Sequence, residues 1–311
     1  MPVKVALLFP GQGAQRPGML SALPDHPAVS HTREEAADRL AQDWRDLEAP
    51  QALEGTLAAQ LALLIAGVAT ARMLTAEGAG IDVVLGQSVG AFPAAVAAGC
   101  LGFGDALELV RRRAAAMARL YPAGFGMVAI MGLTARRVAA LVETSREGEP
   151  LYLSNDNAPL QQVVSGADGA LERASRAALA AGARKAERLR VATPSHCPLL
   201  EPVAADLLEA LRDVEVKAPR LGYASASRAR MISDPAAIAE DLARNVAQPV
   251  RWREATELLV ERGVRRFLQA PPGSVLTDLV SEAHPELRSA SLDSLPLPSA
   301  LYLAARRDDT P

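Results

Sequence analysis

The chain has 311 residues, which is long enough for one large domain with a smaller companion and a substantial core. Hydrophobic residues make up 50% of the sequence and charged residues 22%, values typical of a soluble globular protein. A net charge of −3 and only 4% aromatic residues argue against a basic surface, or a base-stacking surface, for nucleic acid.

The sequence also argues against export, membrane insertion and a cysteine-based metal site. Residues 3–9 form a short apolar run that ends in a turn, which is not the pattern of a signal peptide. The most apolar stretch, residues 61–68, is shorter than the roughly 18 residues of a membrane span. Cys100 and Cys197 are too few for a disulfide framework or a cysteine zinc site. We therefore expect a cytoplasmic protein that inserts into no membrane and binds no metal.

Strand patterns alternate with helical patterns from the N-terminus. The apolar strand at residues 3–9 precedes a helix at 53–76, and a second buried strand at 81–85 leads into a helix at 91–99. Another helix begins at Phe103. This alternation predicts an α/β fold in which helices cover both faces of a parallel sheet.

The pattern breaks at residues 121–124, which read Tyr-Pro-Ala-Gly. Residues 124–192 then have the order strand, helix, strand, strand, helix, strand, which fits a ferredoxin-like unit. The larger pattern resumes after this segment. We predict a large domain formed by residues 1–123 and 193–311, with a ferredoxin-like subdomain inserted at 124–192.

The segment Gly86-Gln87-Ser88-Val89-Gly90 lies between a buried strand and a helix, the setting of a nucleophile elbow. The serine of such an elbow occupies a strained turn, and glycines two residues either side avoid a collision. The N–H of Val89 would then point toward an acyl group on Ser88, at the positive end of the following helix. The pentad alone occurs by chance in roughly one chain in ten of this length. Its context nevertheless favours Ser88 as a nucleophile.

A serine nucleophile needs a general base, and the chain has four histidines. Three of them lie in ordinary polar contexts: His26, His31 and His284. His196 instead lies where the large domain resumes, directly before a helix, and we predict that it is the base. No acidic residue between Ser88 and His196 carries a supporting motif, so the third member of the triad can be a backbone carbonyl.

Two further segments complete a candidate site. Gly11 and Gly13 follow the first strand, and glycines there let backbone N–H groups approach a ligand closely. Residues 111–113 are three arginines on a helix, a pattern typical of a solvated face. Because successive helical residues point in different directions, one of the three can face inward.

Together these segments resemble the malonyl-CoA:acyl carrier protein transacylase family. The resemblance rests on Phe-Pro-Gly-Gln-Gly-Ala-Gln at residues 9–15, the elbow at Ser88, Arg113, and Pro-Ser-His-Cys at residues 194–197. The segments at 249–252 and 271–276 are similar to the family's C-terminal motifs. In detail the chain looks most like the epsilon subunit of malonate decarboxylase, because of residues 17–27, Ala91-Phe92 and residues 155–159.

The resemblance implies a hydrolase-like α/β core with an inserted ferredoxin-like subdomain. Ser88 would be malonylated by malonyl-CoA, and His196 would be its base. A main-chain carbonyl near Val250 or Arg251 would orient the imidazole. The N–H groups of Gln12 and Val89 would form the oxyanion hole.

The resemblance also assigns the substrate and the acceptor. Arg113 would bind the malonyl carboxylate, and Asn157 would line the cleft from the small subdomain. No tightly bound cofactor is implied. The acceptor would be the phosphopantetheine-type thiol of an acyl carrier protein, which on the finer likeness is the carrier subunit of malonate decarboxylase.

Two positions depart from the common family pattern. Gln87 stands where the transacylases usually have histidine. Ala91 stands where fatty-acid relatives often have glutamate, and this second departure favours the decarboxylase branch. Three alternatives remain: a malonyl transacylase of fatty-acid or polyketide synthesis, a serine thioesterase or esterase, and a non-catalytic subunit that holds a carrier protein.

Overall fold

The computed structural model describes residues 4–191 and 193–305. The strands of its larger sheet are β1 (Lys4–Phe9), β2 (Val83–Gly86), β7 (Gly222–Ser225), β8 (Arg230–Ile232), β9 (Val264–Gln269) and β10 (Arg288–Ser291). They lie in the order β10-β9-β1-β2-β7-β8. All neighbouring pairs are parallel except β7 and β8, so the predicted parallel sheet is present.

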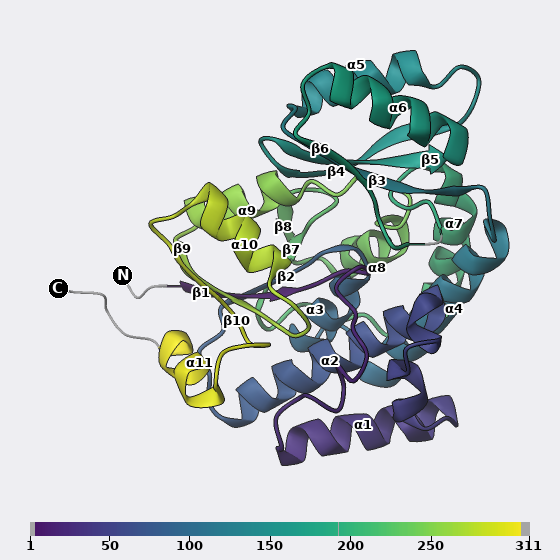
Figure 1. Cartoon of the computed structure of the whole chain (residues 1–311). Helices are drawn as coiled ribbons and strands as arrows, with labels where there is room; N and C mark the ends of the chain where they lie inside the picture. Colours follow the sequence, from purple (N-terminus) through teal and green to yellow (C-terminus); the bar gives the residue numbers. More distant parts are fainter. Residues whose placement is uncertain (1–3, 192, 306–311) are drawn as a thin grey trace.

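Helices cover both faces of this sheet. They are α1 (Pro27–Leu40), α2 (Thr56–Ala76), α3 (Ala91–Ala97), α4 (Phe103–Leu120), α7 (Glu201–Ala210), α8 (Pro235–Arg244), α9 (Trp252–Glu261), α10 (Val275–Ala283) and α11 (Leu297–Ala304). In Figure 1, α1 and α2 lie below the sheet, whereas α9 and α10 lie above it. Alternate residues of β1 follow this division, because Leu7 and Phe9 pack with α2 whereas Ala6 and Leu8 pack with α9. Burial on both faces fixes β1 as a central strand.

The expectation that the apolar stretch at 61–68 falls short of a membrane span does not hold for the helix that contains it, α2. It has 21 residues, and its most apolar 18-residue window has a mean hydropathy of 1.7, enough to cross a membrane by length and composition alone. The hydroxyls of Thr70 and Thr75 do not interrupt it, because they donate to the carbonyls of Ala66 and Ala71 one turn earlier. The fold buries 83% of its most apolar window, so its apolar character is explained by its place in the core.

The register of β1 and β2 brings two predicted turns together. Phe9 lies opposite Gly86, so the carboxyl ends of the two parallel strands are neighbours. The glycine-rich turn that begins at Pro10 therefore lies beside the turn that carries Ser88. Sites in α/β proteins commonly form at this edge of the sheet.

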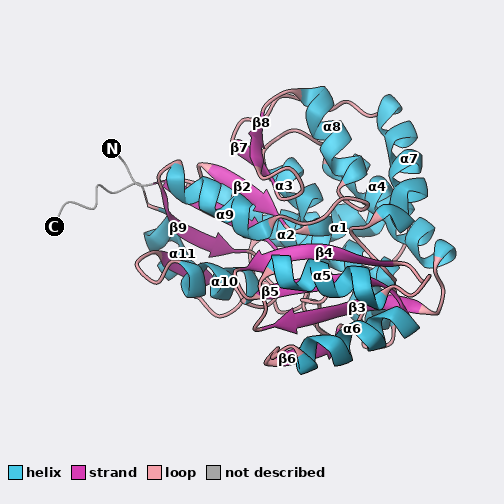
Figure 2. Cartoon of the chain, turned by 90° about the horizontal axis from the view of Figure 1, so that it is seen from above, coloured by secondary structure: helices cyan, strands magenta, loops and turns pink. Residues whose placement is uncertain are grey.

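The smaller sheet is antiparallel. Its strands are β3 (Phe125–Met131), β4 (Leu151–Ala158), β5 (Gln161–Ala167) and β6 (Lys185–Arg188), in the order β4-β5-β3-β6. Figure 2 shows α5 (Ala135–Ser145) and α6 (Asp168–Ala180) lying over this sheet. The opposite face of the sheet is turned toward the larger sheet, as Figure 1 shows.

Strand β4 joins this sheet to the rest of the molecule. The N–H of Val250 donates to the carbonyl of Ser154 at 2.8 Å, and the N–H of Asp156 donates to the carbonyl of Val250 at 2.9 Å. Asn155 and Val250 form an isolated parallel bridge. The segment that leads into α9 is therefore bonded to the free edge of β4.

Candidate active site

Ser88 occupies the tight turn between β2 and α3. Its φ is +57°, in the left-handed region that is costly for a residue with a side chain. A Cβ on Gly86 would lie 2.1 Å from the carbonyl carbon of Gly90, and a Cβ on Gly90 would lie 2.3 Å from the carbonyl oxygen of Phe9. The turn therefore requires glycine at both places, and it presents Ser88 as the sequence predicted.

His196 contacts Ser88 directly. Its Nε2 lies 2.8 Å from the Oγ of Ser88, and its Nδ1 lies 2.7 Å from the carbonyl oxygen of Asn245 and 3.1 Å from that of Gln248. Because Nδ1 faces two acceptors, it carries the proton of the neutral ring, and Nε2 is free to accept the serine proton. Burial and the charge of Arg113 lower the pKa of His196 to about 4, although the two backbone hydrogen bonds raise it. The neutral base is therefore the resting form at neutral pH.

The expectation that the carbonyl of Val250 or Arg251 orients His196 is wrong. The carbonyl of Val250 accepts from the N–H of Asp156, and that of Arg251 accepts from the N–H of Ala255 in the first turn of α9. Both oxygens are thus committed elsewhere. The carbonyls that face the imidazole instead belong to Asn245 and Gln248, which lie just after α8.

Arg113 is the second side chain that contacts Ser88. Only 1% of it is exposed, and it lies on the inner face of α4. Its Nη2 donates to the Oγ of Ser88 at 3.1 Å and its Nη1 to the Oε1 of Gln60 at 2.5 Å, whereas its buried Nε has no partner. Within the described chain no carboxylate forms an ion pair with Arg113. Burial lowers the pKa of Arg113 to about 9.

The neighbouring arginines differ from Arg113 in both burial and partners. Arg111 donates through two nitrogens to Glu108, and Arg112 donates through two nitrogens to Asp206. Both pairs are exposed. Of the three consecutive arginines, only Arg113 points into the site, which agrees with the prediction that one of them faces inward.

Gln12 and Val89 belong to the two turns that meet at the nucleophile, since Gln12 follows Gly11 and Val89 follows Ser88. A Cβ on Gly11 would lie 2.8 Å from the carbonyl oxygen of Gln87, which shows how closely the turn after β1 approaches the elbow. The N–H groups of Gln12 and Val89 have no acceptor among residues 4–191 and 193–305. Two free donors beside the serine are what an oxyanion hole requires.

Gln60 was not predicted, although it organises this end of the site. It is fully buried in α2, and its amide nitrogen donates to the side-chain oxygen of Gln12 at 3.2 Å and to Thr56 at 3.1 Å. Its own oxygen accepts from Arg113. Gln60 therefore links Gln12 to Arg113. Its signal in the sequence is an amide within an otherwise apolar helical run.

Asn157 approaches the elbow from the smaller sheet. Its Oδ1 accepts from the Nε2 of Gln87 at 3.4 Å. A separate cavity of about 340 Å³, which neither Asn157 nor Ser88 lines, lies beside His196 and is lined also by Tyr152 of β4 and Pro249. Both the smaller sheet and the larger unit thus contribute to the surroundings of His196.

Cys197 follows the base in sequence but is not a competing nucleophile. It is only 1% exposed, and burial raises the pKa of its thiol to about 11. A thiol with so high a pKa stays protonated at neutral pH and is a poor nucleophile. This leaves Ser88 as the reactive group beside His196.

Comparison with known proteins places the chain in a family. Residues 6–297 match the model of the acyl transferase domain. The chain belongs to this acyl transferase family. The chain is 36% identical over 305 residues to the malonyl CoA-acyl carrier protein transacylase of Salmonella typhimurium, with 96% of this chain and 98% of the relative covered. The transacylase of Escherichia coli K12 is 35% identical with the same coverage.

Solved structures agree with the family assignment. The acyl-carrier-protein S-malonyltransferase of Burkholderia pseudomallei superimposes with a TM-score of 0.90 at 38% identity, covering 97% of this chain and 99% of that chain. A malonyl-transacylase in complex with its type II PKS acyl-carrier protein gives 0.91 at 34% identity, covering 97% and 98%. The predicted α/β fold with a parallel sheet and the predicted family are confirmed. The finer likeness to the epsilon subunit of malonate decarboxylase stays a hypothesis.

Proposed function

We propose that this acyltransferase moves a malonyl group from malonyl-CoA to the thiol of an acyl carrier protein through an ester on Ser88. One observation carries the choice of malonyl: the buried guanidinium of Arg113 lies 3.1 Å from Ser88 and has no carboxylate partner among the described residues. A buried charge is costly unless an opposite charge accompanies it. An acyl group that ends in a carboxylate would supply that charge.

In the first half-reaction, His196 Nε2 accepts the proton of Ser88 as the serine oxygen attacks the thioester carbonyl. The negative oxygen that forms would take hydrogen bonds from the N–H groups of Gln12 and Val89. Collapse of this intermediate breaks the carbon–sulfur bond. His196 then returns its proton to the departing CoA thiolate, which leaves a malonyl ester on Ser88.

The second half-reaction reverses these roles with a new thiol. His196 accepts the proton of the carrier thiol, and the thiolate attacks the ester carbonyl. When the intermediate collapses, the bond to Ser88 breaks and His196 protonates the serine oxygen. CoA leaves before the carrier reacts, so the kinetics are ping-pong. No tightly bound cofactor takes part.

The acceptor is proposed to be an acyl carrier protein of fatty-acid or polyketide synthesis. The names of the relatives support this choice, because they are malonyl CoA-acyl carrier protein transacylases and one was solved with a type II PKS carrier. The carrier subunit of malonate decarboxylase is the less supported acceptor. It rests on sequence features such as residues 17–27 and Ala91, and the comparisons do not support it.

We further propose that residues 124–192 form a ferredoxin-like subdomain inserted between residues 1–123 and 193–311. The strand order β4-β5-β3-β6, with α5 and α6 on one face, supports this division. The subdomain would contribute Asn157 to the acyl cleft. A cytoplasmic location is part of the proposal, since malonyl-CoA and carrier proteins are the substrates.

Mass spectrometry of the intact protein tests the proposed function. Incubation with malonyl-CoA should add one malonyl group on Ser88, and Ser88→Ala should remove the label. A label on Cys197 would contradict the mechanism. Addition of a carrier should discharge the label onto the carrier thiol, whereas release of free malonate alone would indicate a hydrolase. Comparing carriers of fatty-acid synthesis, polyketide synthesis and malonate decarboxylase identifies the acceptor.

A further inference from the structure

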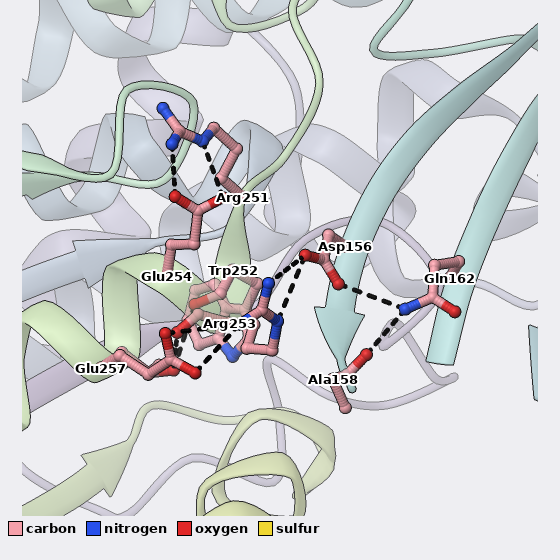
Figure 3. A network of polar contacts seen from close by, with 9 residues as sticks. Asp156, Ala158, Gln162, Arg251, Trp252, Arg253, Glu254 and Glu257 are labelled. Carbon is pink, nitrogen blue, oxygen red and sulfur yellow. Dashed lines mark hydrogen bonds and ion pairs between the residues drawn. The ribbon is translucent and has the colours of Figure 1, made fainter. Parts of the chain in front are cut away.

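An ion pair crosses the junction between β4 and the start of α9, close to the site (Figure 3). Both Nε and Nη2 of Arg253 donate to the Oδ2 of Asp156, at 3.2 and 2.9 Å. The other carboxylate oxygen of Asp156 accepts from the amide of Gln162 at 3.2 Å. Gln162 is fully buried and also donates to the carbonyl of Ala158 at 2.7 Å. Asp156 is thus held from both sides.

The strand is irregular where this network lies. Along β4, Leu153 pairs with Val164 of β5, and Asn155 pairs with Val163, the neighbouring residue of β5. Ser154 therefore has no paired residue in this ladder and is an extra residue of β4. The pairing shifts again between Asp156 and Ala158, which leaves Asn157 as a second extra residue. A bulge of this kind releases a residue from the ladder and redirects its side chain. Here the redirected side chain is that of Asn157, which contacts Gln87 beside the nucleophile.

The same network borders the segment that orients the base. Asp156 donates its N–H to the carbonyl of Val250, and Val250 donates its N–H to Ser154. Two residues before Val250 stands Gln248, whose carbonyl lies 3.1 Å from the Nδ1 of His196. A change in how β4 meets this segment would therefore move both Asn157 and a carbonyl partner of His196.

We propose that Asp156 and Arg253 are positioning residues for acyl transfer: their ion pair fixes the bulge of β4 against residues 248–250, and so places Asn157 and the Gln248 carbonyl around Ser88 and His196. Neither Asp156 nor Arg253 contacts the reacting atoms. This inference rests on the proposed function for the role of Asn157, but its effect on His196 holds for any acylation of Ser88.

The other ion pairs of α9 separate positioning from simple surface charge. Arg253 also pairs with Glu257 at 3.1 Å one turn along α9, and Arg251, the residue before α9, pairs with Glu254 in its first turn. These contacts do not cross to β4 (Figure 3). Exposed pairs within a helix contribute little to stability. Glu257→Gln and Glu254→Gln are therefore matched controls that remove a carboxylate from the same cluster.

The test measures the first-order rate of Ser88 malonylation at saturating malonyl-CoA in a single turnover. Asp156→Asn and Arg253→Gln should each lower it about tenfold, within the range that couplings between contacting side chains span. The double variant should be no slower than either single variant. In a chain that already carries Asn157→Ala, Asp156→Asn should lower the malonylation rate by a smaller factor than it does in the native chain. The two control variants should stay within about twofold of the native rate.

Arg253→Lys keeps the charge without the forked contact and serves as a milder variant if Asp156→Asn does not fold. Rates within about twofold of native in folded Asp156→Asn and Arg253→Gln, or additive losses in the double variant, would overturn the proposal. Inactivation of Ser88 by a neutral sulfonyl fluoride tests the positioning role independently of malonyl transfer. Asp156→Asn and Arg253→Gln should both slow sulfonylation of Ser88. If malonyl-CoA does not label the native chain, that result contradicts malonyl transfer but not the positioning role.

Discussion

Replacement of Arg113 by methionine tests the proposed substrate most directly. The change removes the guanidinium but keeps an unbranched chain in the same buried space. Burial lowers the pKa of Arg113 well below its ordinary value, to about 9, which corresponds to about 5 kcal/mol of unfavourable free energy for the charged form. The malonyl carboxylate would offset this energy by pairing with the guanidinium. The pair should then contribute strongly to malonyl transfer and nothing to acetyl transfer.

Breaking a buried pair of this kind costs about 3–5 kcal/mol, so kcat/KM for malonyl-CoA should fall by roughly two to four orders of magnitude. The value for acetyl-CoA should fall far less, or rise, because the guanidinium no longer opposes an uncharged acyl group. The quantity to measure is the ratio of the two kcat/KM values with one carrier thiol. Arg111→Met and Arg112→Met are the controls, since both arginines lie on α4 but pair with exposed acids. An unchanged ratio in Arg113→Met would refute the assignment of a carboxylate-bearing acyl group.

The same substitution has a predicted effect on stability without ligand. The folded chain binds the Arg113 proton less tightly than the unfolded chain does, so at pH 7 the charge destabilises the folded state. Methionine removes this energy but leaves the oxygen of Gln60 without its donor, a loss of about 1–3 kcal/mol. We expect the free energy of unfolding to rise and Tm to increase by a few degrees. A lower Tm at pH 7 would show that Arg113 stabilises the fold.

The remaining predictions concern the base. His196→Ala should lower turnover by about two to four orders of magnitude, because it removes both the proton acceptor and the donor, and a rate within tenfold of native would require another base. The acid limb of kcat/KM should lie near pH 4, where His196 titrates, and a limb near pH 6.5 would contradict the buried neutral ring. Because the folded pKa is below the unfolded value of 6.5, the contribution of the neutral ring to stability is complete above pH 6.5. It should be lost as pH falls toward 4, by up to about 3 kcal/mol in denaturant titrations.

The parts of the site that could be predicted are those whose geometry is local in sequence. The elbow is one turn between a strand and a helix, and glycine occurs at its two positions because a Cβ there would collide with nearby backbone atoms. The inward direction of one arginine follows from helical geometry, although the sequence alone does not say which of the three it is. The parallel sheet follows from alternating patterns in the same way.

The parts that could not be predicted depend on contacts between distant segments. The carbonyls that face His196 belong to Asn245 and Gln248, and a backbone oxygen has no signature in the residue that bears it. Whether such an oxygen is free depends on which others are already bonded, as the carbonyl of Val250 is bonded to β4. The bulge at Asn157 depends likewise on the pairing of two strands. These features could be identified only in the folded structure.

One buried charge links acyl selection to the strength of the base. Arg113 lies against Ser88, and its charge contributes to the low pKa of His196. A carboxylate paired with Arg113 would cancel much of that charge, so His196 would be a stronger base with malonyl on Ser88 than in the free enzyme. The carrier thiol, which must be deprotonated in the second half-reaction, would meet this stronger base. An acetyl ester would leave the guanidinium uncompensated and the base weak. The arrangement would therefore favour malonyl twice, once when the acyl group binds and once when the thiol attacks.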